Sequence, residues 1–367
     1  MMNRLAVFIA HYSLGNSPSI VNFLDFVSDR YQVDCYLFNV ALTDIPLLRK
    51  KNIRVFDLGF RHIGRYLRER LTARRRSYDR FVAFEPHGFV LCRQLFPAAR
   101  PLYYSLELYL NGDHSGLYYP RRIRAAERRN SGAISGLIIQ SDEKEKLFRA
   151  DYGLPDDVPV FHLPVTCRGP AVAAKSPWLR EKLSLGSRQR IALHLGGINA
   201  FFSCLETAEQ FAALPDWALY FQGYAQPEYL EKLRRLIADR RLNNVFIAAE
   251  PYADLADVDR VLAAADAGLA WYRDLSLNMR TVGRSSGKIA SYLRFGLPVV
   301  TNRYPSLRAA IEAPGAGLCL ERLDELPAAL TRLAPELDVR AANARREYEA
   351  YYRFENYEAA LAAFIAG

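Results

Sequence analysis

Short apolar runs alternate with longer stretches of helical period along this chain, and the whole series occurs twice. Such alternation is typical of repeated β-α units built around a mostly parallel sheet. Predicted strands of the first series are residues 5–10, 33–39, 53–58, 80–84, 102–106 and 137–140. Those of the second are 191–197, 217–223, 244–249, 267–272, 297–302 and 317–320. We therefore expect an α/β protein with two Rossmann-like, doubly wound domains, each binding ligands at the carboxyl ends of its strands.

The boundary between the two series lies in a segment without a sustained apolar period. Residues 166–190 contain Pro170 and Pro177 and lack the pattern of either element. A length of 367 residues also favours two hydrophobic cores. We therefore predict an N-terminal domain over 1–165, a linker over 166–190, a C-terminal domain over 191–345 and a closing helix over 346–367.

Charge and cysteine usage narrow the classes of partner and site. A formal net charge of +9 favours an anionic partner. The first apolar run is too short for a signal peptide, and no run of about 18 apolar residues occurs, so we expect a cytoplasmic protein without a spanning helix. The histidines show no ligand spacing, so no metal site is expected. The cysteines form no CxxC pair and are expected to be reduced: Cys35, Cys92, Cys167, Cys204 and Cys319.

Two small-residue loops follow predicted strands directly. Gly15 lies in a turn between the first strand and a helix, and Gly196 with Gly197 closes the first strand of the second series. Backbone N–H groups at such a helix start can bind an anion, and glycine lets a ligand approach the backbone closely. A plain β-α turn is the alternative explanation of each loop. The dinucleotide fingerprint GxGxxG is absent, which argues against NAD or FAD.

The most informative segment is residues 281–302, TVGRSSGKIASYLRFGLPVVTN. A polar loop enters a helix that stops before a buried strand. Hydroxyl groups, free N–H groups and cationic side chains at one helix start suit a diphosphate. The predicted phosphate-binding residues are Arg284, Ser285, Ser286, Gly287 and Lys288. A solvated lysine at a helix start is the alternative for Lys288.

This segment resembles glycosyltransferase family 4, whose members commonly read SPxKLxEYLAxGxPVV where this chain has SSGKIASYLRFGLPVV. The runs LHLGGI, WALYFQGY and NVFIAAEPYADLADVDRVLAAADAGLAWY are similar to the same family in order and spacing. RPLYYSLELY in the first half is a weaker match. The resemblance implies a GT-B fold with two domains facing a cleft, and a retaining transferase using a nucleotide-sugar donor as substrate, with no other cofactor.

The resemblance also implies roles for individual residues. Gly196 and Gly197 would line the donor diphosphate, Lys288 and its loop would neutralise it, and Tyr252 would contact the nucleobase. The chain departs from the family where its two glutamates fall on Gly283 and Ser291. The histidine of its HE pair is likewise replaced, by Leu106, and its Arg or Lys after the GG loop is absent.

The acceptor is expected on the N-terminal domain, as a saccharide, glycolipid or other glycoconjugate. Candidates for orienting its hydroxyl or accepting its proton follow predicted strands: Glu85, His87, Glu107 and His114. Arginine-rich stretches at 61–80 and 121–129 suit an anionic membrane surface, or form merely solvated helices. No nucleic-acid partner is expected. A nucleotide-sugar epimerase or hydrolase and a catalytically silent binding protein remain as alternatives.

Overall fold

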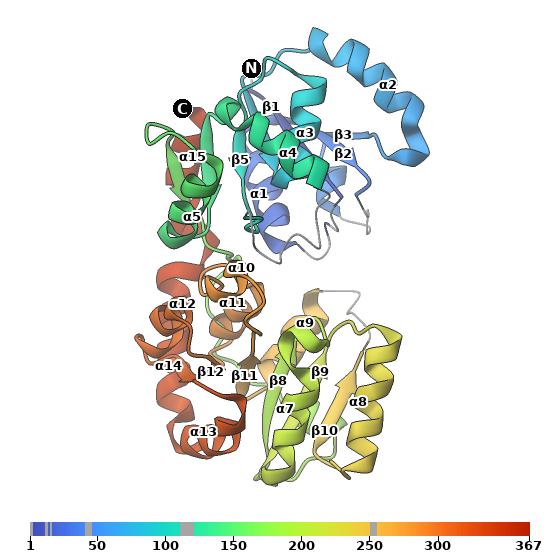
Figure 1. Ribbon diagram of the computed structural model, residues 1–367. Coiled ribbons are helices and arrows are strands. Elements are labelled where there is room, and N and C mark those ends of the chain that lie inside the picture. Colours follow the sequence, from blue (N-terminus) through green and yellow to red (C-terminus); the bar gives the residue numbers. More distant parts are fainter. Residues whose placement is uncertain (1–2, 12–13, 15–16, 41–45, 111–120, 250–254) are drawn as a thin grey trace. The chain divides into compact units, whose positions relative to one another are not determined.

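The chain divides into two compact units in a computed structural model that describes residues 3–11, 14, 17–40, 46–110, 121–249 and 255–367 (Figure 1). The first unit combines Met1–Arg168 with Phe354–Gly367, and the second is Gly169–Arg353. Each unit holds one parallel sheet with helices packed around it. Within the described residues, no helix is long and apolar enough to cross a bilayer.

The first unit is built on a seven-stranded parallel sheet of order β3-β2-β1-β4-β5-β6-β7. An inner strand, β1, is almost wholly buried because apolar residues occupy both faces, as expected when helices cover both sides of a sheet. The strands are β1 Arg4–Ala10, β2 Gln32–Phe38, β3 Ile53–Asp57, β4 Arg80–Phe84, β5 Leu102–Tyr104, β6 Gly136–Ile139 and β7 Val160–His162. The helices are α1 Pro18–Ser28, α2 Ile63–Thr72, α3 Glu85–Leu95, α4 Arg121–Arg129, α5 Asp142–Tyr152 and α15 Glu358–Ala366.

The second unit has a six-stranded parallel sheet of order β10-β9-β8-β11-β12-β13. Its strands are β8 Arg190–Leu195, β9 Trp217–Gln222, β10 Val245–Ala248, β11 Ala267–Ala270, β12 Val299–Asn302 and β13 Gly317–Leu320. Its helices are α6 Trp178–Lys182, α7 Cys204–Gln210, α8 Pro227–Asp239, α9 Leu255–Ala264, α10 Leu277–Arg280, α11 Gly287–Arg294, α12 Pro305–Leu307, α13 Leu326–Leu333 and α14 Leu337–Glu347. Helix α7 packs beside α8, and α11 beside α14 (Figure 1).

The expected fold class, two doubly wound α/β domains, is confirmed. Every predicted strand is present within a few residues of its predicted bounds. The prediction missed β7, whose three residues are half-buried or exposed and therefore carry no apolar period. A glycine ends helix α11 as expected, since Gly296 follows it with a φ of +60°.

The division of the chain differs from the predicted one at two places. Residues 169–190 belong to the second unit rather than to a free linker, because Val172 N–H donates to Arg294 O at 2.7 Å and Ser176 N–H to Ala263 O at 3.0 Å. The predicted closing helix is split near Phe354, and its last part returns to the first unit. There Leu361 and Ile365 are completely buried in the core around β1.

A buried tyrosine fixes α11 on the second sheet. The Tyr292 hydroxyl accepts a hydrogen bond from Leu195 N–H at 2.8 Å and lies 2.9 Å from Leu193 O, to which it donates. Its ring lies over Gly268 of β11, where a Cβ would come within 2.3 Å of a ring carbon. Helix α11 therefore sits over the two central strands, β8 and β11, and no larger residue than glycine fits at 268.

We predict that Tyr292→Phe lowers the free energy of unfolding of the second unit by about 1–3 kcal/mol. The phenylalanine ring preserves the packing but leaves the buried Leu195 N–H without an acceptor, which carries the full desolvation cost of that group. Urea unfolding followed by circular dichroism measures the change. Tyr224→Phe is the matched control, since Tyr224 is 55% exposed. Equal unfolding curves for the two variants would contradict the anchoring role.

Candidate functional site

The topology of the second unit places one crevice at the ends of β8 and β11. From β8 the chain continues to β9 and β10 on one side, whereas β11, β12 and β13 extend the sheet on the other. The loops that follow these two central strands therefore diverge, and ligands of open parallel sheets bind at such a point. Gly196 and Gly197 follow β8, and Trp271 and Tyr272 follow β11.

The glycine loop after β8 brings backbone close to the start of α11. Gly196 has a φ of +108°, a conformation that other residues rarely adopt, and a Cβ there would lie 3.7 Å from Lys288 Cε. Gly223, at the end of β9, leaves room for the loop, because a Cβ at that position would lie 1.8 Å from Gly196 O. Both predicted loop glycines, Gly196 and Gly197, thus stand at the crevice.

The start of α11 presents polar groups to the same crevice. The Ser286 side chain caps the helix by accepting from Ile289 N–H at 3.2 Å, and its hydroxyl lies 2.5 Å from that of Tyr272. The first N–H groups of the helix, from Gly287 onward, have no acceptors within it. Ser285 is turned back, with its hydroxyl 3.5 Å from Thr281 O. The helix start therefore offers N–H donors and a positive dipole end to an anion.

Lys288 carries a positive charge that no described acceptor matches. Its Nζ atom is buried and has no hydrogen-bond partner in the described part of the chain. It lies 3.9 Å from the ring centre of Phe202 and 5.7 Å from that of Tyr272. Burial lowers the pKa of Lys288 to about 8, and the nearby Cys204 thiol partly opposes this shift. A buried ammonium over aromatic faces without a counter-charge is a binding place for an anion.

The surroundings of Lys288 contain neutral groups. His194 is buried, and its Nε2 atom lies 2.9 Å from Gly197 O, so the neutral ring donates to that carbonyl. Burial, followed by the charge of Lys288, holds the pKa of His194 well below its usual range. Burial likewise raises the pKa of Cys204 to about 11. Lys288 is therefore the charged group of this cluster near pH 7.

Arg284, predicted as a second phosphate ligand, has its charge matched elsewhere. Its guanidinium donates to Glu347 at 2.7 Å and stacks 4.1 Å above the ring of Tyr351. These contacts tie the loop before α11 to the C-terminal helices. Gly283, where the resembled family has a glutamate, has no room for a side chain, because a Cβ would lie 2.2 Å from Ser306 O. The site is thus smaller than predicted, with Lys288 as its cation.

The first unit has its own crevice, between the ends of β1 and β4. His11 follows β1, and His87 lies in the first turn of α3 after β4, with the two ring centres 4.5 Å apart. Burial and then the charge of His11 lower the pKa of His87 to about 4, so His87 is neutral near pH 7. A neutral imidazole at a strand end can accept a proton or orient a hydroxyl.

Glu85 and Glu107 follow β4 and β5 of the same sheet. Glu85 is fully buried with a φ of +60°, and its Oε1 atom accepts from the N–H groups of Leu106 and Glu107. Burial raises the pKa of Glu85 to about 8, while those two N–H groups oppose the shift. Glu85 therefore positions the loop after β5, which carries Glu107. The buried Lys144 has its pKa lowered to about 8 by burial, against the attraction of Glu107.

Three predicted site residues, Gly15, His114 and Tyr252, lie outside the described residues. Sequence reasoning did not assign His11, His194, Phe202 and Tyr272 to a site. Tyr272 could have been found, because it is the last residue of the predicted strand 267–272 of the second series. The contact of Phe202 with Lys288 joins the 3-10 turn Ala200–Phe202 to helix α11, and no local pattern signals it.

Comparison with known proteins gives matches of fold and of part of the sequence. Residues 242–350 match the model of the glucosyltransferase 3-like C-terminal domain family, a range that includes the start of α11. No curated protein matches the chain significantly. Solved structures match over nearly the full length of both chains.

Three solved structures illustrate this likeness. WaaG, a glycosyltransferase involved in lipopolysaccharide biosynthesis, is 19% identical, with a TM-score of 0.71 and coverage of 99% of this chain and 100% of that one. HepE of Anabaena, solved with UDP-glucose, is 15% identical, with a TM-score of 0.74 and 99% of each chain covered. Sucrose-phosphate synthase of Thermosynechococcus elongatus is 13% identical, with a TM-score of 0.72 and coverage of 99% and 98%.

The fold is that of the GT-B glycosyltransferases. Each unit of this GT-B chain has a candidate site of its own, at the switch point of its sheet. No group of three or more His, Cys, Asp or Glu side chains that could hold a metal ion occurs in the described ranges.

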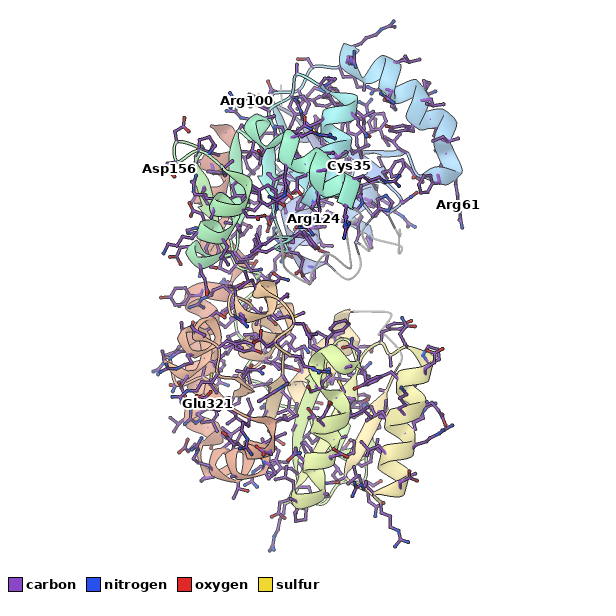
Figure 2. All side chains as sticks on the ribbon, viewed as in Figure 1. Cys35, Arg61, Arg100, Arg124, Asp156 and Glu321 are labelled. Carbon is purple, nitrogen blue, oxygen red and sulfur yellow. The ribbon has the colours of Figure 1, made fainter. Side chains whose placement is uncertain are left out.

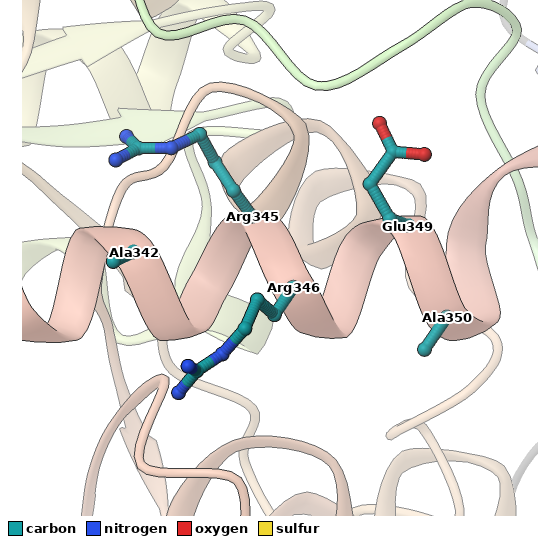
Figure 3. A pocket seen from close by; sticks show the side chains of 5 residues that line it. All are labelled: Ala342, Arg345, Arg346, Glu349 and Ala350. Atoms are coloured by element: carbon teal, nitrogen blue, oxygen red, sulfur yellow. The ribbon is translucent and has the colours of Figure 1, made fainter.

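A separate surface depression lies along α14 and the π-helical turn Tyr348–Tyr352, lined by Ala342, Arg345, Arg346, Glu349 and Ala350 (Figure 3). Arg345 and Glu349 point to one side of the helix and Arg346 to the other. Glu349 already accepts from Ala171 N–H at 2.6 Å. These charged groups do not converge, and they lie on a helix rather than at strand ends, so this depression is separate from the two candidate crevices.

The unmatched charge of Lys288 predicts a particular pH dependence of stability. Between pH 8 and the ordinary lysine pKa of 10.5, the unfolded chain retains a proton that the folded protein has lost, so stability rises with pH. Relative to Lys288→Met, which has no such proton, the wild type should gain about 1–3 kcal/mol across this window. Urea unfolding of both proteins from pH 7 to pH 10.5 measures the difference. A difference that does not change with pH would contradict the buried, unpaired state.

Proposed function

We propose that the protein is a glycosyltransferase that takes a sugar from a nucleoside diphosphate donor, with retention of configuration and without a metal ion, and passes it to a saccharide, glycolipid or other glycoconjugate. The observation that carries the proposal is the buried Lys288 ammonium without a counter-charge at the switch point of the second sheet. A diphosphate placed between the glycine loop and the start of α11 supplies that charge. The reaction class is a hexosyl transfer.

The nucleotide is proposed to be a uridine diphosphate. Among the structures of the same fold, HepE of Anabaena was solved with UDP, with UDP and glucose, and with UDP-glucose. The match to the glucosyltransferase 3-like C-terminal domain covers the part of this chain that holds Lys288. Glucose is therefore the first sugar to test.

The proposed transfer uses fixed charge where other enzymes use an ion. Bond cleavage between the anomeric carbon and the diphosphate leaves negative charge on the leaving group, which Lys288 and the first N–H groups of α11 stabilise. The leaving diphosphate oxygen can take the proton of the acceptor hydroxyl as that hydroxyl attacks from the same face. Glu107 and His87 of the first unit are the proposed groups that orient the acceptor.

The donor assignment is tested by calorimetric titration with UDP and UDP-glucose. Lys288→Ala should weaken binding at least about tenfold, because a charge-assisted contact contributes roughly 1.5–3 kcal/mol. Lys288→Arg should retain part of the affinity. Lys182→Ala is the matched control, since it also removes an ammonium above an aromatic ring, 4.8 Å from the centre of Trp178, but outside the crevice. Wild-type affinity in Lys288→Ala would refute the assignment.

The main alternative is a nucleotide-sugar epimerase or hydrolase of the same fold. An assay of UDP release with and without an acceptor distinguishes it from a transferase. Rapid release of UDP from UDP-glucose alone supports the alternative, whereas release that depends on an added saccharide or glycolipid supports transfer. Tight donor binding without turnover on any acceptor identifies a binding protein.

We predict that transfer activity survives excess EDTA. A divalent cation requires several oxygen ligands, usually from carboxylates. Asp274, the acidic residue in the loop after β11, is held by Arg280 through contacts of 2.6 and 2.8 Å. Activity should be unchanged after dialysis against the chelator, as measured by UDP release. Loss of activity that manganese or magnesium restores would contradict the proposal that Lys288 replaces an ion.

A further inference from the structure

Helix α2 of the first unit and the turn before it expose a stripe of large apolar side chains. Phe60 is 69% exposed, Ile63 50%, Leu67 54% and Leu71 79%. Ile63, Leu67 and Leu71 follow each other at intervals of four residues, which places them on one face of the helix. These four residues are half of the large hydrophobic side chains with marked exposure in the described part of the chain.

The opposite face holds α2 against the unit, so the exposure does not come from a loose helix. The Tyr66 hydroxyl donates to Gln94 Oε1 at 2.9 Å, and Ala73 is fully buried. The buried Glu69 carboxylate pairs with Arg76 through two contacts. Since the helix already has an inner face with its own contacts, the apolar stripe on the outer side is additional.

Arginines surround the stripe. Six of them are exposed in the segment 60–76: Arg61, Arg65, Arg68, Arg70, Arg74 and Arg75. Glu69 is the one carboxylate of this fully described segment, and Arg76 neutralises it. Arg61, in the turn before α2, extends outward (Figure 2). The outer surface of α2 is therefore both strongly cationic and apolar.

We propose that this surface, Phe60 to Arg75 on the outer side of α2, binds in the interface of a bilayer that contains anionic lipids. The apolar side chains would enter the headgroup and acyl boundary, while the arginines would contact lipid phosphates around them. A nucleic acid also attracts arginines, but of the four apolar side chains only Phe60 has a flat ring on which a base can stack, and Ile63, Leu67 and Leu71 would remain in water. A bilayer with anionic lipids can bind both the apolar side chains and the arginines of this surface.

The experiment is sedimentation of the full chain with vesicles, in two compositions: phosphatidylcholine alone, and phosphatidylcholine with about a third phosphatidylglycerol. We expect binding to the anionic vesicles that falls steeply as salt is raised from 50 to 300 mM, because the charges act at the surface. Leu67→Asp with Leu71→Asp should weaken this binding at least about tenfold. So should Arg70, Arg74 and Arg75 changed to Glu, with Arg76 kept because it pairs with Glu69.

Matched controls change the same residue types on the second unit. Val339→Asp removes an apolar side chain that is 67% exposed, and Arg234→Glu with Arg240→Glu reverses two exposed arginines on and just after α8. These variants should bind vesicles like the wild type. Urea unfolding followed by circular dichroism, measured on all variants, verifies that each one folds, and this readout does not depend on the donor assignment.

Three results would overturn the membrane proposal. Equal binding to both vesicle types would exclude the anionic preference, and wild-type binding by the leucine variant would exclude insertion. Binding of a single-stranded RNA that exceeds binding to anionic vesicles, and that the leucine variant retains, would assign the arginines to nucleic acid instead.

Discussion

The hydrogen bonds of one buried hydroxyl group, that of Tyr292, determine where the candidate binding residues of the second unit lie. Tyr292 of α11 binds the backbone of β8 through Leu195 N–H and Leu193 O, and lies over Gly268 of β11. Four residues earlier in the same helix, Lys288 is thereby held at the ends of these two strands. The two central strands, the glycine loop and the start of α11 therefore pack as one unit. A shift of α11 on the sheet would move Lys288, the Ser286 cap and the first N–H donors of the helix together.

The two crevices differ in their electrostatics, and the difference suits two kinds of ligand, an anion in the second unit and uncharged hydroxyl groups in the first. In the second unit the buried Lys288 ammonium has no hydrogen-bond partner among the described residues, so it attracts an anion such as phosphate. In the first unit the titrating groups are brought towards their uncharged forms, since burial lowers the pKa of His87 and raises that of Glu85. Neutral groups of this kind can exchange hydrogen bonds with sugar hydroxyls without competing for the donor's charge.

Sequence alone could predict the elements of this fold, because apolar runs bounded by glycine, proline and polar residues mark buried parallel strands. It could also locate Lys288, since the polar loop and the helix start are contiguous. It could not show that Arg284 is taken by Glu347, which lies 63 residues further along the chain. Nor could it show the rings beneath Lys288, because Phe202 and Tyr272 follow different strands. Contacts of this kind depend on which loops the topology brings together rather than on local spacing.

The return of the last residues to the first unit has a consequence for synthesis. Phe354, Leu361 and Ile365 belong to the core around β1, Arg80 donates to Ile365 O at 2.8 Å, and Phe354 N–H donates to Cys167 O at 2.9 Å. The second unit is one continuous stretch of chain, whereas the first lacks these side chains until the residues after 353 have been synthesised. A ribosome therefore releases the beginning of the protein with an open core, and the part made first is the last to reach its final packing.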